Sequence, residues 1–307
     1  MPLGYRLQGM LGLGDNIHQR AVVRHLMKSG VVHLETPWPS VYHDLAGERL
    51  RFVKRPTSLR TQAKNAEREE SKFIKHAAPS AVNMRVGYSH DSIRRQGSFL
   101  AAMCQPFSIS NPDFSLPVPQ SWVDQVRDML PTQGKPVMVY RPLVERKEWI
   151  GCASRNPDKD AYKALFDAIA DDYFVVSIAD LQPGFEWISG HEVRADLSFH
   201  AGELSFEQLA GLFSLADLVF CSPGFSLILA QAVDAKLVAV FGGHESPRLY
   251  DHGRDNNYLV SPIKPCECFS KTHACNKAIN IELEAHKLRS FAHAAKQKVG
   301  HAEPAPV

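Results

Sequence analysis

Short apolar segments alternate with helix-like segments between residues 137 and 241. The apolar segments are four to six residues long and rich in β-branched and aromatic side chains: Val137–Tyr140, Tyr173–Ile178, Leu218–Cys221 and Leu237–Phe241. The segments between them carry apolar residues at helical spacing: Asp160–Ala170, Ser205–Ala216 with Ser205 as its N-cap, and Phe225–Ala235. Strands that are apolar on both faces are typical of a parallel sheet covered by helices on either side. This half of the chain is therefore predicted to form a Rossmann-like α/β lobe.

The first 130 residues predict a second α/β lobe with a less regular pattern. A strand at Tyr5–Met10 leads through a glycine-rich turn to a helix over about residues 16–28, and Val31–Glu35 is the next predicted strand. We interpret the basic segment Arg49–His76 as loop and solvated helix, and Phe99–Cys104 as core. A length of 307 residues suits two lobes of about 150 residues each.

A turn-rich stretch, Pro131–Pro136, separates the two patterns and indicates a domain boundary. We expect a first domain over residues 1–130, a second over residues 131–281, and a C-terminal helix and tail over residues 282–307. The last seven residues, HAEPAPV, are expected to fray. The predicted fold class is α/β with two Rossmann-like lobes.

Composition excludes several classes of protein. Hydrophobic residues make up 44% of the chain and charged residues 22%, which describes a soluble globular protein. The longest apolar run, Phe99–Cys104, is far shorter than the ~20 residues of a membrane span. The amino terminus lacks the pattern of a secretory signal, and six cysteines without a signal favour reduced thiols. We therefore expect a cytoplasmic protein with no disulfide scaffold and no stable membrane insertion.

The formal net charge of +2 conceals an asymmetry along the chain. Residues 1–130 carry 17 Lys and Arg against 11 Asp and Glu, whereas residues 131–307 carry 18 against 22. A basic first half suits an anionic partner such as a phosphorylated glycan, a nucleic acid or a lipid head group. An unevenly charged solvated surface explains the same counts equally well.

The turn Gly12-Leu-Gly14-Asp15 falls where the first predicted strand gives way to its helix. Glycines there admit a ligand close to the backbone, and free N–H groups at a helix start attract anions. Ligands of open α/β sheets bind at the carboxyl ends of the strands, so Asp15 is a candidate general base for an acceptor hydroxyl. From spacing alone, a helix N-cap is the commoner role for such a residue. The helix carries the candidate acceptor contacts Asn16, His18 and Arg20.

The pattern G-x-G-x-x-G is incomplete at this turn, because Ile17 stands at the third glycine position. A dinucleotide site, and with it an NAD-dependent dehydrogenase, is therefore only weakly supported.

Three further groups follow predicted strands of the second half. The turn Cys221-Ser-Pro-Gly-Phe-Ser226 precedes a helix and offers small residues and backbone N–H groups to a pyrophosphate, with Ser222, Gly224, Phe225 and Ser226 as candidates. The cations that can neutralise a departing diphosphate are Arg141, Arg146 and Lys147. Gly243 and Glu245 come after the strand at residues 237–241, and Glu245 can accept hydrogen bonds from ribose hydroxyls. In isolation, each group can also be an ordinary turn, a solvated charge cluster or a surface loop.

A cysteine-rich loop holds four residues of metal-ligand type: Cys266, Cys268, His273 and Cys275. The C-x-C pair is tighter than the usual C-x₂₋₄-C, so we interpret the loop as reduced and partly buried, with zinc as the alternative. Asp158-Lys-Asp160 is similar to the metal-binding D-x-D of some sugar transferases, but it falls at an expected helix start, where acids are common. No metal and no other cofactor is predicted.

Together, and in this order, these segments resemble glycosyltransferase family 9, which includes the ADP-heptose:lipopolysaccharide heptosyltransferases. The resemblance runs from Gly12 to about Cys275. It is most specific in ADLVFCSPGFSLILAQA, residues 216–232, which is similar to the donor-site segment of the family, and PCECFSKTHAC, residues 265–275, is similar to its cysteine-bearing loop. The donor-site segment departs from the common family pattern D-[ST]-G-x-x-H, because Ser222 replaces the acid and Leu227 the histidine.

The resemblance implies a two-lobed GT-B fold, with the acceptor on the first lobe, the nucleotide-sugar on the second and no required metal. Asp15 falls on the proposed catalytic base of the family and Lys147 on its phosphate-contacting lysine. We therefore predict a metal-independent glycosyltransferase that moves a sugar from a nucleotide-diphosphate donor to a hydroxyl of an anionic acceptor, such as lipopolysaccharide. The alternatives are a phage-type transferase that acts on hydroxymethylated pyrimidines in DNA, and a non-catalytic relative that binds nucleotide-sugars.

Overall fold

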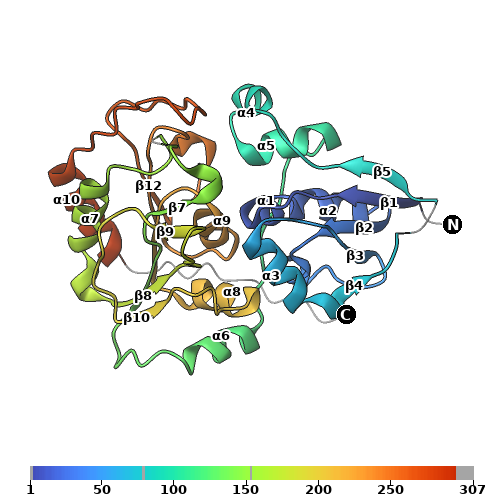
Figure 1. Ribbon diagram of the computed structural model, residues 1–307, viewed down its shortest axis with the longest axis horizontal. Helices are drawn as coiled ribbons and strands as arrows, with labels where there is room; N and C mark the ends of the chain where they lie inside the picture. Colours follow the sequence, from blue (N-terminus) through green and yellow to red (C-terminus); the bar gives the residue numbers. More distant parts are fainter. Residues whose placement is uncertain (1–2, 78–79, 153, 295–307) are drawn as a thin grey trace.

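Two parallel sheets lie side by side in the computed structural model, each flanked by helices (Figure 1). The structure describes residues 3–77, 80–152 and 154–294. The expected frayed tail HAEPAPV lies outside the described residues. The first sheet is at the right of Figure 1 in blue to cyan, and the second is at the left in green to orange. We call these two halves the first lobe and the second lobe.

The first lobe is built on a sheet of order β4-β3-β2-β1-β5, in which the neighbouring strands pair in parallel. Its strands are β1 Leu3–Gln8, β2 Gly30–Thr36, β3 Leu50–Lys54, β4 Phe73–Ile74 and β5 Val82–Arg85. Its helices are α1 Leu13–His18, α2 Arg20–Met27, α3 Arg60–Arg68, α4 His90–Gln96 and α5 Phe99–Cys104. Short 3-10 turns are η1 Pro39–Tyr42, η2 Glu70–Lys72 and η3 Gln105–Phe107.

The basic segment Arg49–His76 differs from its prediction, because it contributes the strands β3 and β4 as well as the helix α3. In β3, Leu50 and Phe52 are buried while Arg51 points to solvent. This alternation is that of a strand with one face in the core, but the strand is short and its exposed residues are basic. The predicted helix over residues 16–28 is divided at Gln19 into α1 and α2.

The second lobe is built on a parallel sheet of order β10-β8-β6-β11-β12-β13, as the apolar segments predicted. Its strands are β6 Val137–Tyr140, β8 Phe174–Ile178, β10 Leu197–Phe199, β11 Leu218–Cys221, β12 Leu237–Val240 and β13 Asn257–Val260. An antiparallel pair is formed by β7 Val144–Arg146 and β9 Glu186–Ile188. Four of these strands, β6, β8, β11 and β12, are buried along their whole length, which confirms that both faces of the sheet are covered.

The helices of this lobe are α7 Lys159–Asp167, α8 Phe206–Leu215, α9 Phe225–Ala232 and α10 Ile281–His293. Short 3-10 turns are η4 Lys147–Trp149, η5 Ala170–Asp172 and η6 Pro247–Leu249. Ser205 is the N-cap of α8, as predicted, and accepts a hydrogen bond from the backbone N–H of Gln208. Asp158 caps α7 in the same way, which explains the acids of the D-x-D pattern.

Among the described residues, two pairs of α-helices from the two halves of the chain pack closely together. In the first, α1 packs against α9, and a Cβ on Gly14 would lie 2.7 Å from the side chain of Ile228. In the second, α6 Gln120–Arg127, which comes before the linker, packs against α8 of the second lobe, because Gly211 leaves room for the backbone of Trp122. The domain boundaries at residues 130 and 281 stay a prediction. Among the described helices, none joins the length and the hydrophobicity that a membrane crossing requires.

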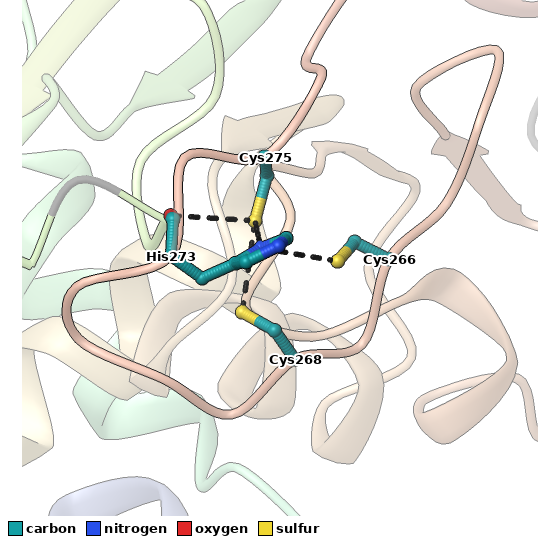
Figure 2. Close-up of side chains that lie close together, drawn as sticks. All are labelled: Cys266, Cys268, His273 and Cys275. Carbon is teal, nitrogen blue, oxygen red and sulfur yellow. Dashed lines mark hydrogen bonds between the residues drawn. The ribbon is translucent and has the colours of Figure 1, made fainter.

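The loop between β13 and α10 gathers Cys266, Cys268, His273 and Cys275 at one point, outside the cavity described below (Figure 2). It also brings Phe269 to the interface between the lobes. Phe269 is buried and stacks on His90 of α4, with ring centroids 4.8 Å apart.

Candidate active site

A cavity of about 890 Å³ lies between the two lobes. Its walls include the first turn of α1 and helix α3 from the first lobe, and the segments after β6, β11 and β12 from the second. The carboxyl ends of strands from both sheets thus face one space, which is where open α/β sheets bind ligands. Most of the sequence-predicted site residues lie in its wall: Asp15, His18, Arg141, Arg146, Lys147, Ser222, Gly224, Phe225, Ser226 and Glu245.

Asp15 lies in the first turn of α1 and faces the cavity. Gly12 is the N-cap of α1, so Asp15 does not have the capping role that spacing alone favoured. Its Oδ1 accepts a hydrogen bond of 2.6 Å from the hydroxyl of Tyr88. Burial raises the pKa of Asp15 to about 6, against the effect of the Tyr88 hydrogen bond, and the negative charge of Glu245 adds to the rise. A carboxylate with such a pKa is ionised at neutral pH and is still basic enough to accept a proton.

The start of α9 forms the facing wall. Its N-cap, Gly224, has φ 149°, and no side chain caps the free N–H groups of the first turn. The hydroxyl of Ser226 is buried there without a hydrogen-bond partner among the described residues. A buried hydroxyl without a partner is costly, and here it lies beside a helix N-terminus that attracts anions. This part of the wall is therefore suited to a phosphate group.

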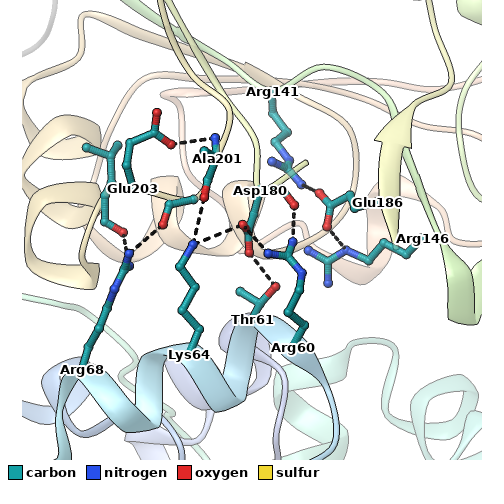
Figure 3. Close-up of polar contacts among 12 residues, drawn as sticks. Arg60, Thr61, Lys64, Arg68, Arg141, Arg146, Asp180, Glu186, Ala201 and Glu203 are labelled. Carbon is teal, nitrogen blue, oxygen red and sulfur yellow. Dashed lines mark hydrogen bonds and ion pairs between the residues drawn. The ribbon is translucent and has the colours of Figure 1, made fainter. Parts of the chain in front are cut away.

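Two arginines on the same side share one carboxylate (Figure 3). Arg141 Nη2 lies 2.8 Å from Glu186 Oε1, and Arg146 Nε lies 2.7 Å from Glu186 Oε2. Arg141 is buried, so it is not part of a solvated charge cluster, and burial lowers its pKa although Glu186 opposes the change. Arg141, Arg146 and Glu186 together carry one net positive charge, and all three line the cavity. Lys147 lies beside it, with Nζ 5.5 Å from the ring centroid of Phe185.

Three sequence-predicted residues lie outside the cavity wall. Asn16 is fully buried, and its side chain donates to the carbonyls of Met10 and Gly12. Arg20 is also fully buried, and its guanidinium donates to Asp44 at 2.8 Å and to backbone carbonyls. These two side chains hold the first lobe together, so they are not free to contact an acceptor.

Gly243, the third, packs against the cysteine loop, and a Cβ there would collide with Cys275. His18 does reach the cavity, but it is almost fully buried. Burial, with a contribution from His252, lowers the pKa of His18 to about 3, so its imidazole is neutral at physiological pH.

A polar contact between the lobes, which sequence reasoning missed, forms another side of the cavity (Figure 3). Asp180 accepts hydrogen bonds of 2.9 Å from Arg60 Nη1 and from the hydroxyl of Thr61. On the same helix, α3, Lys64 and Arg68 donate to backbone carbonyls of the second lobe at 2.9–3.0 Å. Burial opposes ionisation of Asp180, but Thr61 and Arg60 outweigh it and lower its pKa. We call this group the α3 contact.

Tyr88, Arg155 and Glu186 were also missed. Tyr88 follows β5, the neighbour of β1 in the sheet, and Arg155 lies with its guanidinium 4.1 Å from the ring centroid of Trp149. Each belongs to a segment without motif or periodicity, and Glu186 is the first residue of β9, so no sequence pattern singled them out.

The comparison with known proteins rests on structure. No model of a known protein family and no curated protein matches the sequence. A family 9 glycosyl transferase from Veillonella parvula is 11% identical, with a TM-score of 0.61 over 94% of this chain and 97% of that chain. The E. coli ADP-heptose lps heptosyltransferase II is 13% identical, with a TM-score of 0.56 over 94% of this chain and 98% of that chain. The chain has the GT-B fold.

A third solved structure, the iron-containing dodecameric glycosyltransferase TibC from enterotoxigenic E. coli, extends the likeness. It is 13% identical, with a TM-score of 0.61 over 95% of this chain and 76% of that chain. At such identities the likeness concerns the fold. It confirms the predicted two-lobed α/β architecture.

Proposed function

We propose that the protein is a glycosyltransferase that moves a sugar from a nucleotide-diphosphate donor to a hydroxyl of an anionic acceptor, in the manner of heptosyltransferases. The observation that carries the proposal is the arrangement of the cavity. A carboxylate with a raised pKa, Asp15, lies on one wall, and the open helix start at Gly224–Ser226 lies on the other with the arginine pair.

Asp15 acts as the general base. As the acceptor hydroxyl attacks the anomeric carbon, its proton passes to Asp15, a bond forms from the acceptor oxygen to that carbon, and the bond to the diphosphate oxygen breaks. The leaving diphosphate takes the electron pair. Tyr88 holds the Asp15 carboxylate in place through its hydroxyl.

The donor side stabilises the negative charge that develops on the diphosphate. The stabilising groups are in place before the reaction, so the protein does not have to reorganise as the charge develops. They are the N–H groups at the start of α9, the hydroxyls of Ser222 and Ser226, and the charges of Arg141, Arg146 and Lys147. We propose that these groups replace a divalent cation, so that the transfer is metal-independent. Phe225, over which the Arg141 guanidinium lies at 5.4 Å, closes the donor site, and Glu245 accepts from the ribose.

Two further facts support the proposal. The structure of TibC in complex with ADP-D-β-D-heptose matches this chain with a TM-score of 0.58 at 14% identity. The excess of basic residues in the first 130 positions supports an anionic acceptor on the first lobe. The neighbours reported above carry no name that favours DNA as the acceptor.

The first test is a screen of nucleoside diphosphates and nucleotide-sugars on the full chain. We expect one nucleoside diphosphate to raise the melting temperature, since a ligand at 100 times its Kd adds about 2.7 kcal/mol of stability. We also expect slow release of that diphosphate from the matching nucleotide-sugar. No shift with any nucleotide would contradict the donor site. A shift without release of diphosphate from any nucleotide-sugar, with or without acceptor, would identify a non-catalytic binding protein.

A further inference from the structure

The loop between β13 and α10 brings four ligand-type atoms together. The reactive atoms of Cys266, Cys268, His273 and Cys275 all lie within 4.8 Å of one another (Figure 2). The sulfurs of Cys268 and Cys275 are 3.6 Å apart, and His273 Nδ1 lies 3.2 Å from Cys275 Sγ and 3.5 Å from Cys266 Sγ. Thiolates and imidazole are the ligands that zinc prefers in closed structural sites.

The distances fit a tetrahedral ion. Bonds of about 2.3 Å to sulfur and about 2.0–2.1 Å to nitrogen place neighbouring ligand atoms of a tetrahedron about 3.6–3.8 Å apart. The separations of 3.2, 3.5 and 3.6 Å given above are close to these edges. In addition, the backbone N–H of Ser270 points to the sulfur of Cys268 at 3.4 Å, as donors around metal-bound thiolates do.

The backbone explains how the tight C-x-C pair can serve. Glu267, between the two cysteines, has φ 52°. This left-handed conformation turns the chain between the two cysteines, and the sulfurs of both belong to the same cluster. The conformation is strained for a residue with a side chain, and the Glu267 carboxylate is held there by Arg248 and Ser246. The tight spacing, which made zinc only the alternative interpretation of the loop, is therefore compatible with a metal site.

A disulfide explains the cluster less well. All the cysteines of the loop are free thiols. Three cysteines also leave one unpaired after any disulfide, and a disulfide gives no role to His273, whose ring nitrogen faces two of the sulfurs. Three reduced thiols grouped near the surface are prone to oxidation, and a bound metal ion removes this vulnerability.

We propose that Cys266, Cys268, His273 and Cys275 bind one thiophilic divalent metal ion, with zinc as the expected ion, in a closed tetrahedral site. Four protein ligands leave no open position, so the ion is structural and takes no part in glycosyl transfer. The proposal does not depend on the proposed function.

The site fixes one wall of the cavity. The N–H of Cys268 donates to the carbonyl of Gly243 at 3.2 Å, and the N–H of Phe269 donates to the carbonyl of His244 at 3.1 Å. Phe269 and His244 both line the cavity, and Phe269 also contacts the first lobe through His90 and Arg94. The metal therefore holds the segment that contributes Phe269 to the cavity and to the contact between the lobes.

Metal analysis of the full chain, purified without chelator, tests the proposal. We expect about one equivalent of zinc per chain, released by a thiol-blocking mercurial and detected with a zinc-binding dye. Cys268→Ser should reduce the content to below about 0.2 equivalents, since thiolate is a far better ligand than hydroxyl. Cys152→Ser, a neighbouring cysteine outside the cluster, is the matched control and should keep the full equivalent.

A second variant tests whether misfolding, and not the loss of a ligand, explains a loss of metal in Cys268→Ser. His273→Cys converts the site to four thiolates, so it should keep about one equivalent, and its cobalt-substituted form should show a shifted visible spectrum relative to the wild-type protein. Removal of the metal should raise hydrogen exchange in residues 262–278 more than in the sheets. One equivalent of iron that is lost in Cys268→Ser would also support the site and would identify the ion.

Three results would overturn the proposal. The first is a wild-type protein with almost no bound metal after growth in zinc-supplemented medium. The second is a disulfide between two loop cysteines, found by mass spectrometry of the unreduced protein. The third is an unchanged metal content in Cys268→Ser. None of these results bears on nucleotide binding, which separates them from a failure of the proposed function.

Discussion

The two walls of the cavity handle charge in opposite ways. On the first lobe, Asp15 is a carboxylate that burial makes more basic, with one hydrogen bond from Tyr88. On the second lobe, Arg141 and Arg146 both lie against Glu186, and the adjacent helix start is free of a capping side chain. In the proposed mechanism, the first wall accepts a proton and the second binds the anionic diphosphate.

The comparison shows that burial affects the charged groups of the two walls in different ways. A single buried carboxylate gains affinity for a proton, because its charged form is poorly solvated. Glu186 lies between the buried Arg141 and the partly exposed Arg146 and compensates for the burial of the Arg141 charge, so the three groups together leave one positive charge for a ligand. The following substitutions act on one wall at a time.

Asp15→Asn should have the largest effect. It removes the base but keeps the shape of the side chain, so kcat should fall about 10²- to 10⁴-fold while the affinity for nucleoside diphosphate stays unchanged. Because the amide carries no buried charge, we expect no loss of thermal stability at neutral pH. Steady-state kinetics and calorimetry measure the two effects, with the exposed Asp128→Asn as control.

The wild-type pH profile sharpens this prediction. The folded pKa of Asp15 is about 6, so kcat should rise as the pH increases through about 6 and then level off. Two results would remove Asp15 from the mechanism. One is a kcat that stays constant between about pH 5 and pH 8, a range that extends about one unit or more to either side of that pKa. The other is an unchanged kcat of Asp15→Asn.

Lys147→Ala acts on the other wall and should have an intermediate effect. Loss of one charged contact to the diphosphate should weaken its binding about tenfold, since hydrogen bonds to charged groups are worth about 1.5–3 kcal/mol and Lys147 is partly solvated. Isothermal titration calorimetry measures the affinity. Lys159→Ala, on the exposed start of α7, is the matched control. Equal affinities for all three proteins would show that Lys147 does not touch the donor.

Asp180→Asn tests the α3 contact and should have the smallest effect. The pKa of Asp180 is lowered in the folded state, so its charge stabilises the protein at neutral pH, and this contribution is lost as the pH falls through the folded pKa. We expect a fall in melting temperature of about 2 °C for each kcal/mol lost at pH 7. The difference from wild type should shrink under acidic conditions. A constant difference at all pH values would contradict the role of the charge.

The second lobe could be predicted well from the sequence, and the first lobe less well. Strands β6 and β11 match their predicted bounds, because a strand covered on both faces is apolar at every position. The strand β3 was missed, because its outward residues are charged and only Leu50 and Phe52 are buried. Helix α6 precedes the linker but packs on the second lobe, a long-range contact that periodicity does not encode.

The site shows the same limit. The residues in the turns after β1, β6 and β11 could be selected, because the carboxyl ends of parallel strands gather at one edge. Asn16 and Arg20 lie one and five residues after Asp15, yet the side chains of both are buried inside the lobe. Glu186 lies far from Arg141 and Arg146 in the sequence, and their pairing depends on the antiparallel strands β7 and β9. Partners of this kind follow from tertiary structure alone.

The contact of Gly14 with Ile228 lies next to both the proposed base and the proposed phosphate site. Gly14 precedes Asp15, and Ile228 lies one turn into α9, beyond the phosphate-facing residues. Any motion that parts the lobes at this point moves the proposed base, Asp15, away from the proposed phosphate site at the start of α9. A donor site that is complete while Asp15 is withdrawn is then rarely formed. Water therefore seldom replaces the acceptor hydroxyl in the attack on the nucleotide-sugar.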